Sequence, residues 1–542
     1  MAQAKLTAPS PATPARKFLS KMALEDYNAA LAGLYDQDPK ARYAAIKEAV
    51  RTGQHTAAAS LLADPDPCVQ AAAISALGLL GEWSSDYAST IKECMLKADD
   101  KEVKVAALIA LGKMGAASTM SIESIARCLE NQDPDVVAAA CTAIGDLSAV
   151  SYSDKLVGLL KNSDTDVVVA AVGALGSLDT SSDDVGKLLS SKETKVKKAA
   201  VAALAKMSGV ESYAKSAAAL LGDSDAYVRL YACNFISALG EKASGEAATI
   251  GKLLSDKEAG VRACAASALA GIGAKADSQV EGLENLLTDE AEDKTTLLMT
   301  TAGMAPKVSP VLRKPACAAA AALAAVGSKG YSKAPAIAKG LMSKDSEIKI
   351  ACAKAISEMG EAGAKCTDDL IKLADDPAPN VVAAACLALG TLAETTGSMS
   401  SAGEKVAECL NDKLPVVRTA AATSLAKMGD EATNYLDILV KKLQDPAWSV
   451  RAAAAKAVAS CGELGQMYAS DICRMLFDNE VAVQVAAIES LGMMGKRGSA
   501  FAEEIASMAE APQAEIQTAA AKTLTSFGPK IAAQFGIAAI EG

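Results

Sequence analysis

Apolar and small residues recur along this chain in one order, with a period of about 33 residues. Each copy has a mostly aliphatic anchor, alanine at most of the third and fourth positions after it, and usually a larger apolar residue at the eighth. The anchors are Ala41, Val69, Val103, Val136, Val167, Val196, Val228, Val261, Pro315, Ile348, Val381, Val417, Val450, Val483 and Ile516. A fixed period of roughly 20 to 50 residues is typical of stacked supersecondary units. The pattern therefore predicts a solenoid.

The copy at residues 434–462 shows why each unit is expected to form two helices. Four apolar residues are spaced as one stripe of a first helix: Tyr435, Ile438, Leu439 and Leu443. Asp445-Pro446 then predicts the start of a second helix, because a carboxylate caps free N–H groups and proline fits the first helical position. The inward residues of this second helix are Val450, Ala453, Ala454, Val458 and Cys461. The same Asp-Pro start occurs at Asp38, Asp64, Asp133 and Asp376.

Glycine and alanine complete the pattern of the unit. Glycine occupies the twelfth position after the anchor in eleven of the fifteen copies, as at Gly462, and it is expected to end the second helix in the left-handed conformation. Alanine at the third and fourth positions is expected to let neighbouring helices approach closely.

This arrangement resembles HEAT repeats, in particular the short, alanine-rich variety called PBS-lyase-like HEAT repeats. The resemblance covers roughly residues 23–530. It implies an all-α fold, an armadillo-like α-α superhelix of about fifteen two-helix repeats. Armadillo repeats themselves have about 40 residues and three helices, whereas a unit of 33 residues has room for two.

The repeats predict one continuous solenoid over residues 23–530 rather than several globular domains. Residues 1–22, which are basic and precede the first acid, form an N-terminal tail or a targeting segment. Residues 531–542 form a C-terminal cap over the last unit, or a tail that offers apolar side chains to a partner.

One step in the repeat is much longer than the others. It separates Val261 from Pro315 by 54 residues, which places an insertion at about 289–314. Long loops in compact arrays are usually either functional or disordered. We expect this insertion to bind a partner or to pack on the protein itself, with a merely tolerated insertion as the alternative. Its candidate partner-binding residues are Leu297, Leu298 and Met299.

The formal net charge of −11 is spread along the chain, which argues against a nucleic-acid groove. A basic residue nevertheless follows the anchor at Lys104, Lys197, Arg229, Arg262, Lys349, Arg418 and Arg451. These cations could form a phosphate-binding stripe. The resemblance to HEAT repeats favours a ladder instead, in which each cation pairs with the turn aspartate of a neighbouring unit. The suitable aspartates are Asp256, Asp345, Asp412 and Asp445.

Cysteine and histidine usage disfavours metal and acid–base chemistry. None of the thirteen cysteines forms a Cys-x-x-Cys pair, and the reduced, structural thiols expected at interior positions are Cys141, Cys233, Cys264, Cys352 and Cys386. The single histidine, His55, is expected to be solvated or to cap a helix. We therefore predict that the chain has no catalytic residue, cofactor or metal site, and that it is not an enzyme. The thiols favour a reducing, cytoplasmic compartment, and import into an organelle by residues 1–22 is the alternative.

The resemblance implies a non-catalytic scaffold or adaptor, whose second helices line a concave face and bind several protein partners in a larger assembly. No apolar run is long enough to span a membrane, and the pattern favours protein over nucleic acid or a small molecule. Candidate contacts lie at the sixth and tenth positions after the anchors: Lys113, Lys206, Lys354, Glu358, Lys427 and Lys456. Trp448 is either a partner anchor or a residue that packs on the next unit.

Two further functions are compatible with this repeat type. One is a helper that handles a phycobilin chromophore, as the resemblance to phycobilisome lyase subunits implies, and it would need a concave pocket with charged groups for the propionates. The other is a regulatory scaffold subunit of the phosphatase type, which differs from the first function only in its partner.

Overall fold

The computed structural model describes residues 33–291, 314–397 and 400–536. In these ranges the chain consists of α-helices and short 3-10 helices joined by turns, and it contains no strand. This confirms the all-α solenoid expected from the sequence. The chain divides into two compact units, Met1–Leu220 and Leu221–Gly542.

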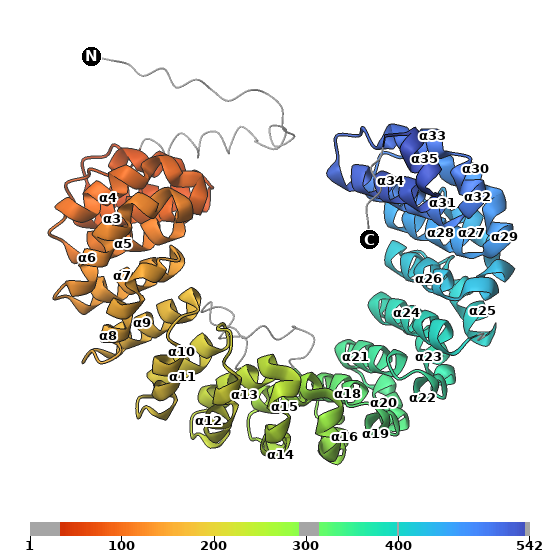
Figure 1. Ribbon diagram of the computed structural model, residues 1–542, viewed down its shortest axis with the longest axis horizontal. Coiled ribbons are helices and arrows are strands. Elements are labelled where there is room, and N and C mark those ends of the chain that lie inside the picture. The colour runs from red at the N-terminus through yellow and green to blue at the C-terminus, as the bar shows by residue number, and fades with distance from the viewer. Residues whose placement is uncertain (1–32, 292–313, 398–399, 537–542) are drawn as a thin grey trace. The chain divides into compact units, whose positions relative to one another are not determined.

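The first unit contains pairs of helices in two layers, one of first helices and one of second helices (Figure 1). The second helices pack directly on one another along the layer. They are α2 (Pro39–Arg51), α3 (Pro67–Gly78), α5 (Lys101–Lys113), α7 (Pro134–Asp146), α9 (Thr165–Leu178) and α11 (Thr194–Leu204). The first helices are shorter, and include α4 (Ala88–Lys97), α6 (Ile122–Arg127), α8 (Ser153–Leu159), α10 (Ser182–Lys187) and α12 (Ala214–Ala219).

The second unit repeats this arrangement. Its second helices are α13 (Ala226–Leu239), α15 (Ala259–Ile272), α18 (Pro315–Ala325), α21 (Ser346–Ser357), α24 (Pro379–Thr396), α26 (Pro415–Lys427), α28 (Trp448–Ser460), α31 (Val481–Met493) and α34 (Ala514–Ser526). Its first helices include α14 (Ala247–Lys252), α16 (Val280–Leu286), α20 (Ala334–Lys339), α23 (Thr367–Leu373), α25 (Ser400–Cys409), α27 (Leu436–Lys442), α30 (Ala469–Arg474) and α33 (Ala502–Met508). A last helix, α35 (Pro529–Gln534), packs on α34.

Small residues bring the second helices together, as the alanine pattern predicts. The fourth position after the anchor is fully buried in many copies, for example at Ala140 and Ala171. A glycine at the ninth position allows an even closer approach. A Cβ atom on Gly145 would stand 2.9 Å from the Cα of Ala174 on the next second helix. The backbones themselves are therefore in contact.

The Asp-Pro pairs do not all start a helix, and here the sequence prediction is partly wrong. Asp38 and Asp133 are N-caps followed by proline, as expected. Asp64, Asp376 and Asp445 instead lie two residues before the N-cap, so α28 starts at Trp448 after Ala447. The Asp445 carboxylate accepts a hydrogen bond from the Ala447 amide within the turn. The two groups of aspartates therefore stand at different positions of the repeat.

The twelfth position has the expected left-handed backbone. Gly115 has φ +57° and Gly462 has φ +56°. In two copies without glycine there, Ser148 and Asp179 adopt φ values of +53° and +52°. A residue with a Cβ atom is strained in this conformation.

Ser148→Gly is expected to raise the free energy of unfolding by up to about 1 kcal/mol, because glycine adopts positive φ without strain. Urea unfolding followed by circular dichroism measures the change. Ser177→Gly, at an exposed position inside α9, is the control and is expected to destabilise by a similar amount. If Ser148→Gly and Ser177→Gly both lowered the free energy of unfolding by the same amount, Ser148 would not be strained.

The insertion does not interrupt the stack. The amide of Ala316 donates to the carbonyl of Asp289, 3.1 Å away. The Lys333 Nζ atom bridges Glu281 and Glu284 of α16 at 2.8 and 2.6 Å. Repeats on both sides therefore contact each other directly. The candidate residues Leu297, Leu298 and Met299 lie outside the described residues, so their role stays a prediction.

Candidate functional site

The second helices of the first unit form a groove of about 1040 Å³ on their exposed face. Side chains of α2, α3, α5 and α7 line it, so it crosses four successive repeats. Its floor consists largely of small residues, including Ala71, Ala72, Ala138 and Ala139. The short side chains that let helices pack closely thus also leave this face hollow.

Large apolar side chains stand exposed around the floor. Tyr43 of α2 is 37% exposed, Ile109 of α5 is 38% exposed, and Leu79 at the end of α3 is 58% exposed. All three line the groove. Apolar groups collected in a concave surface of this kind are typical of contact sites for another molecule.

Charged groups stand among these apolar side chains. The Lys47 Nζ atom lies 4.7 Å from the centre of the Tyr43 ring, a cation–π contact. Lys101 pairs with Asp135 across α5 and α7 at 2.7 Å. Lys113 and Glu102 also line the groove. The site thus offers both apolar surface and a mixture of charges.

The structure places the predicted candidates Lys113 and Lys206 around one carboxylate. Burial raises the pKa of Asp146, at the end of α7, while the positive charges of Lys113 and Lys206 counteract this rise. Lys113 therefore lines the groove and also lies near a carboxylate of the next second helix.

The candidates of the second unit lie on its second helices and are paired. Lys456 contacts Glu489 at 2.8 Å, and Lys427 contacts Glu394 at 3.1 Å. Lys354 lies 4.0 Å from Glu358, the residue that caps the end of its own helix. Each of these lysines thus has a glutamate beside it within the protein. Trp448, the first residue of α28, is 49% exposed, so it packs only partly on its surroundings.

Sequence reasoning missed the apolar part of the groove. Ile109 and Lys47 stand at the sixth position after their anchors, and Leu79 stands at the tenth. These are the same positions that gave the lysine candidates. The sequence therefore contained a signal for the groove, but only the charged residues at these positions were taken as candidate contacts.

The predicted ladder of ion pairs is confirmed. Arg229 contacts Asp256, Arg418 contacts Asp445, and Arg451 contacts Asp478, at 2.7 to 2.8 Å. Further rungs are Arg262–Asp289 and Lys349–Asp376. Because these cations hold carboxylates of the next repeat, the ladder accounts for them without a phosphate-binding stripe.

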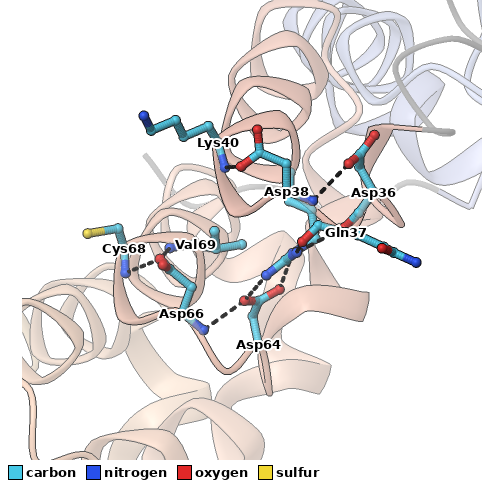
Figure 2. A network of polar contacts seen from close by, with 9 residues as sticks. Asp36, Gln37, Asp38, Lys40, Asp64, Asp66, Cys68 and Val69 are labelled. Atoms are coloured by element: carbon cyan, nitrogen blue, oxygen red, sulfur yellow. Dashed lines mark hydrogen bonds and ion pairs between the residues drawn. The ribbon is translucent and has the colours of Figure 1, made fainter.

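Three aspects of the ladder differ from the prediction. Asp345 pairs with Lys314, which precedes an anchor instead of following it. Asp412 contributes its backbone carbonyl, 2.9 Å from Nη1 of Arg418, instead of its carboxylate. A further rung joins Arg42 to Asp64, and Figure 2 shows Asp64 beside the turn of Asp36 and Gln37. Lys104 has no such ion pair in the described part of the chain.

Asp478→Asn is expected to lower the free energy of unfolding at neutral pH by about 1 kcal/mol, with a smaller difference in acid. Hydrogen bonds from Arg451 hold the pKa of Asp478 below its ordinary value. The unfolded state therefore binds a proton more readily, so the stabilisation is complete above about pH 5 and is lost as pH falls below about 4. Urea unfolding at pH 7 and pH 3 tests this. An equal difference at both pH values would contradict it.

The histidine and the cysteines have structural surroundings. The His55 Nδ1 atom lies 3.2 Å from the carbonyl of Ala76. The interior cysteines predicted from the sequence are buried, and burial raises the pKa of the Cys141 thiol to about 12. In residues 33–291, 314–397 and 400–536, no three or more His, Cys, Asp and Glu side chains form a group suited to a metal ion. Among the helices described, none is both long and apolar enough to cross a membrane.

Stacked helix pairs, buried alanine contacts and a ladder between neighbouring turns define this protein as an α-solenoid. A family model of HEAT repeats matches residues 27–112, 88–176, 214–299, 334–421 and 367–459, which together make up more than half of the chain. The chain therefore belongs to the HEAT-repeat family. No curated protein matches its sequence.

Solved structures of karyopherins have a similar fold. Yeast importin-beta (Kap95p) is 13% identical with a TM-score of 0.61, and the match covers 94% of this chain and 76% of that one. Kap121p bound to Nup53p is 12% identical with a TM-score of 0.60, covering 95% and 68%. At such low identity the likeness concerns the fold alone.

Proposed function

We propose that this protein is a non-catalytic scaffold or adaptor that binds protein partners on the exposed face of its second helices. The observation that carries the proposal is the groove of α2, α3, α5 and α7, with Tyr43, Leu79 and Ile109 exposed in it. Exposed aromatic and aliphatic groups in a concave surface supply the desolvated contacts that dominate protein binding. Several partners in one assembly, in a reducing compartment, agree with the length of the repeat array and its free thiols.

Structural neighbours support this proposal. One matched structure contains Kap121p bound to Nup53p, and another is a complex of Kap95 and Nup1 with a TM-score of 0.58. The HEAT fold therefore holds protein partners in those proteins. For the present chain the same use of the fold is our inference.

Affinity capture from the native source tests the proposal, with bound proteins identified by mass spectrometry. Ile109→Asp places a charge in the groove and is expected to release partners that bind there. Leu387→Asp is the matched control, because Leu387 also stands at the sixth position of a second helix and is 41% exposed. If both variants retained the partners, the binding surface would lie outside the groove. Capture of no protein by any form would contradict the scaffold.

A third variant tests the insertion separately. The replaced segment must be limited to residues 292–313, because Asp289 accepts a hydrogen bond from Arg262 and Lys314 pairs with Asp345. A Gly-Ser linker in this place leaves these contacts intact. Loss of a partner from this variant alone would assign that partner to the insertion.

The groove gives one observation in favour of phycobilin handling, the second function considered. Lys47 and Lys113 are exposed cations at a concave apolar surface, which is what the propionates of a bilin would need. Coexpression with a phycobiliprotein, followed by absorbance, separates this function from the scaffold. A covalently coloured phycobiliprotein formed only in the presence of this chain would favour chromophore handling. A regulatory phosphatase scaffold would be recognised by a phosphatase subunit in the capture experiment.

A further inference from the structure

We propose that the first unit bends in the run of second helices from α3 to α11, where one kind of junction between repeats occurs four times in succession. Junctions of another kind follow one another from α13 to α24 in the second unit, and they restrict the motion of their helices. This inference concerns motion within the array and does not rest on the scaffold function.

The two kinds of junction differ at the ninth position after the anchor. Six second helices have glycine there: Gly78, Gly112, Gly145, Gly176, Gly390 and Gly492. Every rung of the ladder described above starts instead from a repeat with a side chain at this position: Val50, Ser237, Ala270, Ala324, Ser357, Ala426 or Ala459. We call the two kinds glycine junctions and ladder junctions.

The repeats that start a glycine junction lack the charges of a rung. Their residues directly after the anchor are Gln70, Lys104, Val137, Val168, Val382 and Gln484. Only Lys104 is a cation, and the next turn has Asn131 where a ladder junction has aspartate. In the described part of the chain, glycine and the buried ion pair are therefore alternatives.

The two kinds of junction are held at opposite ends of their helices. A Cβ atom on Gly112, Gly145 or Gly176 would stand 2.8 to 3.1 Å from the Cα of an alanine on the next second helix. These glycines lie in the C-terminal half of the helix. A ladder junction is held near the N-terminal end, where Arg418 donates two hydrogen bonds to Asp445 and two to carbonyls of its own turn. The first and ninth positions lie about 12 Å apart along a helix.

A glycine junction therefore leaves the N-terminal ends of its helices free to pivot about the backbone contact. Exposed ion pairs cross two of these junctions, at Lys101–Asp135 and Lys195–Asp166, but surface pairs contribute little. Helices α7 and α9 contain no lysine or arginine, so no ion pair joins them.

Rotations at successive junctions add along the run from α3 to α11. The groove crosses two of these junctions, between α3 and α5 and between α5 and α7. Bending of this run therefore changes the width of the groove.

Double electron–electron resonance on the full-length protein tests the proposal. Spin labels are attached to genetically encoded amino acids, because the thirteen cysteines make thiol labelling unselective. One pair of labels replaces Ser75 of α3 and Ala202 of α11, across four glycine junctions. The matched pair replaces Asn234 of α13 and Leu387 of α24, across four ladder junctions. All four residues stand at the sixth position after their anchors.

Both label pairs are expected at roughly 32 to 40 Å, four helix spacings of about 8 to 10 Å. We expect the distance distribution from α3 to α11 to be at least about twice as wide as that from α13 to α24. Equal widths, or a wider distribution from α13 to α24, would overturn the proposal.

The double variant Lys104→Arg/Asn131→Asp then supplies both partners of a rung between α5 and α7. It is expected to narrow the α3 to α11 distribution by up to about a quarter, because one junction of four is converted. Lys104→Arg/Gln132→Asp is the matched control, with the same charges but the carboxylate one residue away from the ladder position. Circular dichroism verifies that both variants fold. If both distributions are as wide as that of wild type, the missing ion pair does not free these helices, and the proposal fails.

Discussion

Gly498→Ala is expected to destabilise the second unit by about 3 kcal/mol or more, one of the largest effects of any single methyl group in this protein. A Cβ atom at this position would stand 1.8 Å from the carbonyl oxygen of Leu491, which belongs to the backbone of α31. Neither group can move without shifting a helix. Hydrogen exchange of α31 and urea unfolding measure the loss.

Gly173→Ala is the control for this substitution. Gly173 lies inside α9, and nothing stands within 4 Å of the position of its Cβ atom. Alanine there is expected to stabilise the first unit by up to about 1 kcal/mol through its higher helix propensity. A Gly498→Ala protein as stable as wild type would show that the turn relaxes without cost.

The glycine at position 498 also explains the form of the turn between repeats. Four copies have glycine fifteen positions after the anchor, at Gly330, Gly363, Gly465 and Gly498, and each turn there contains a short α-helix. Copies with serine or alanine at this position, and with glycine at the twelfth as in those four, form a seven-residue 3-10 helix instead, as at Ser84 and Ala276. Ser84 uses its hydroxyl to donate to the carbonyl of Leu77, 2.8 Å away. One side chain therefore distinguishes the two kinds of turn.

Arg418→Met is expected to cost about 3 kcal/mol, because it leaves the carboxylate of Asp445 buried without its cation. The two side chains are only 10% and 5% exposed, and two hydrogen bonds at 2.8 and 2.7 Å join them. Burial alone would raise the pKa of Asp445, but the hydrogen bonds from Arg418 reverse this and lower it. Methionine keeps most of the stem of the side chain, so the loss reports mainly on the charge. Unfolding in urea and exchange of the α26 and α28 amides measure it.

Two further variants separate charge from packing at this rung. Adding Asp445→Asn to Arg418→Met removes the uncompensated charge and is expected to recover part of the loss. Lys354→Met at the exposed pair with Glu358 is expected to change stability by less than about 0.5 kcal/mol. If the exposed and the buried substitution lowered the free energy of unfolding equally, burial would not increase the contribution of the ion pair to stability.

Features that depend on local backbone preference could be predicted from the sequence. The glycine pattern placed the left-handed turn at Gly115 and Gly462, because few other residues adopt that conformation without strain. The buried alanines likewise followed from the period. Asp445-Pro446 was assigned wrongly because Asp-Pro occurs at two positions of the repeat. Asp38 stands three residues before its anchor and caps a helix, whereas Asp445 stands five residues before its anchor and pairs with Arg418 of the preceding repeat.

The groove depended on longer-range information. Which carboxylate stands near a lysine of a second helix follows from the residue that the neighbouring helix presents, such as Glu489 opposite Lys456. This match depends on helix register in space, and it changes with insertions of one or two residues between copies. Exposure of Leu79 and Ile109 together also requires the helices to be stacked.

The direct contact between the repeats on either side of residues 292–313 makes this place suitable for engineering. The amide of Ala316 bonds to the carbonyl of Asp289, so the two ends of the stack are held next to each other whatever chain lies between them. A fluorescent protein or another domain whose own termini are close together would therefore be accepted here, and it would label the protein internally without a fusion to either chain end.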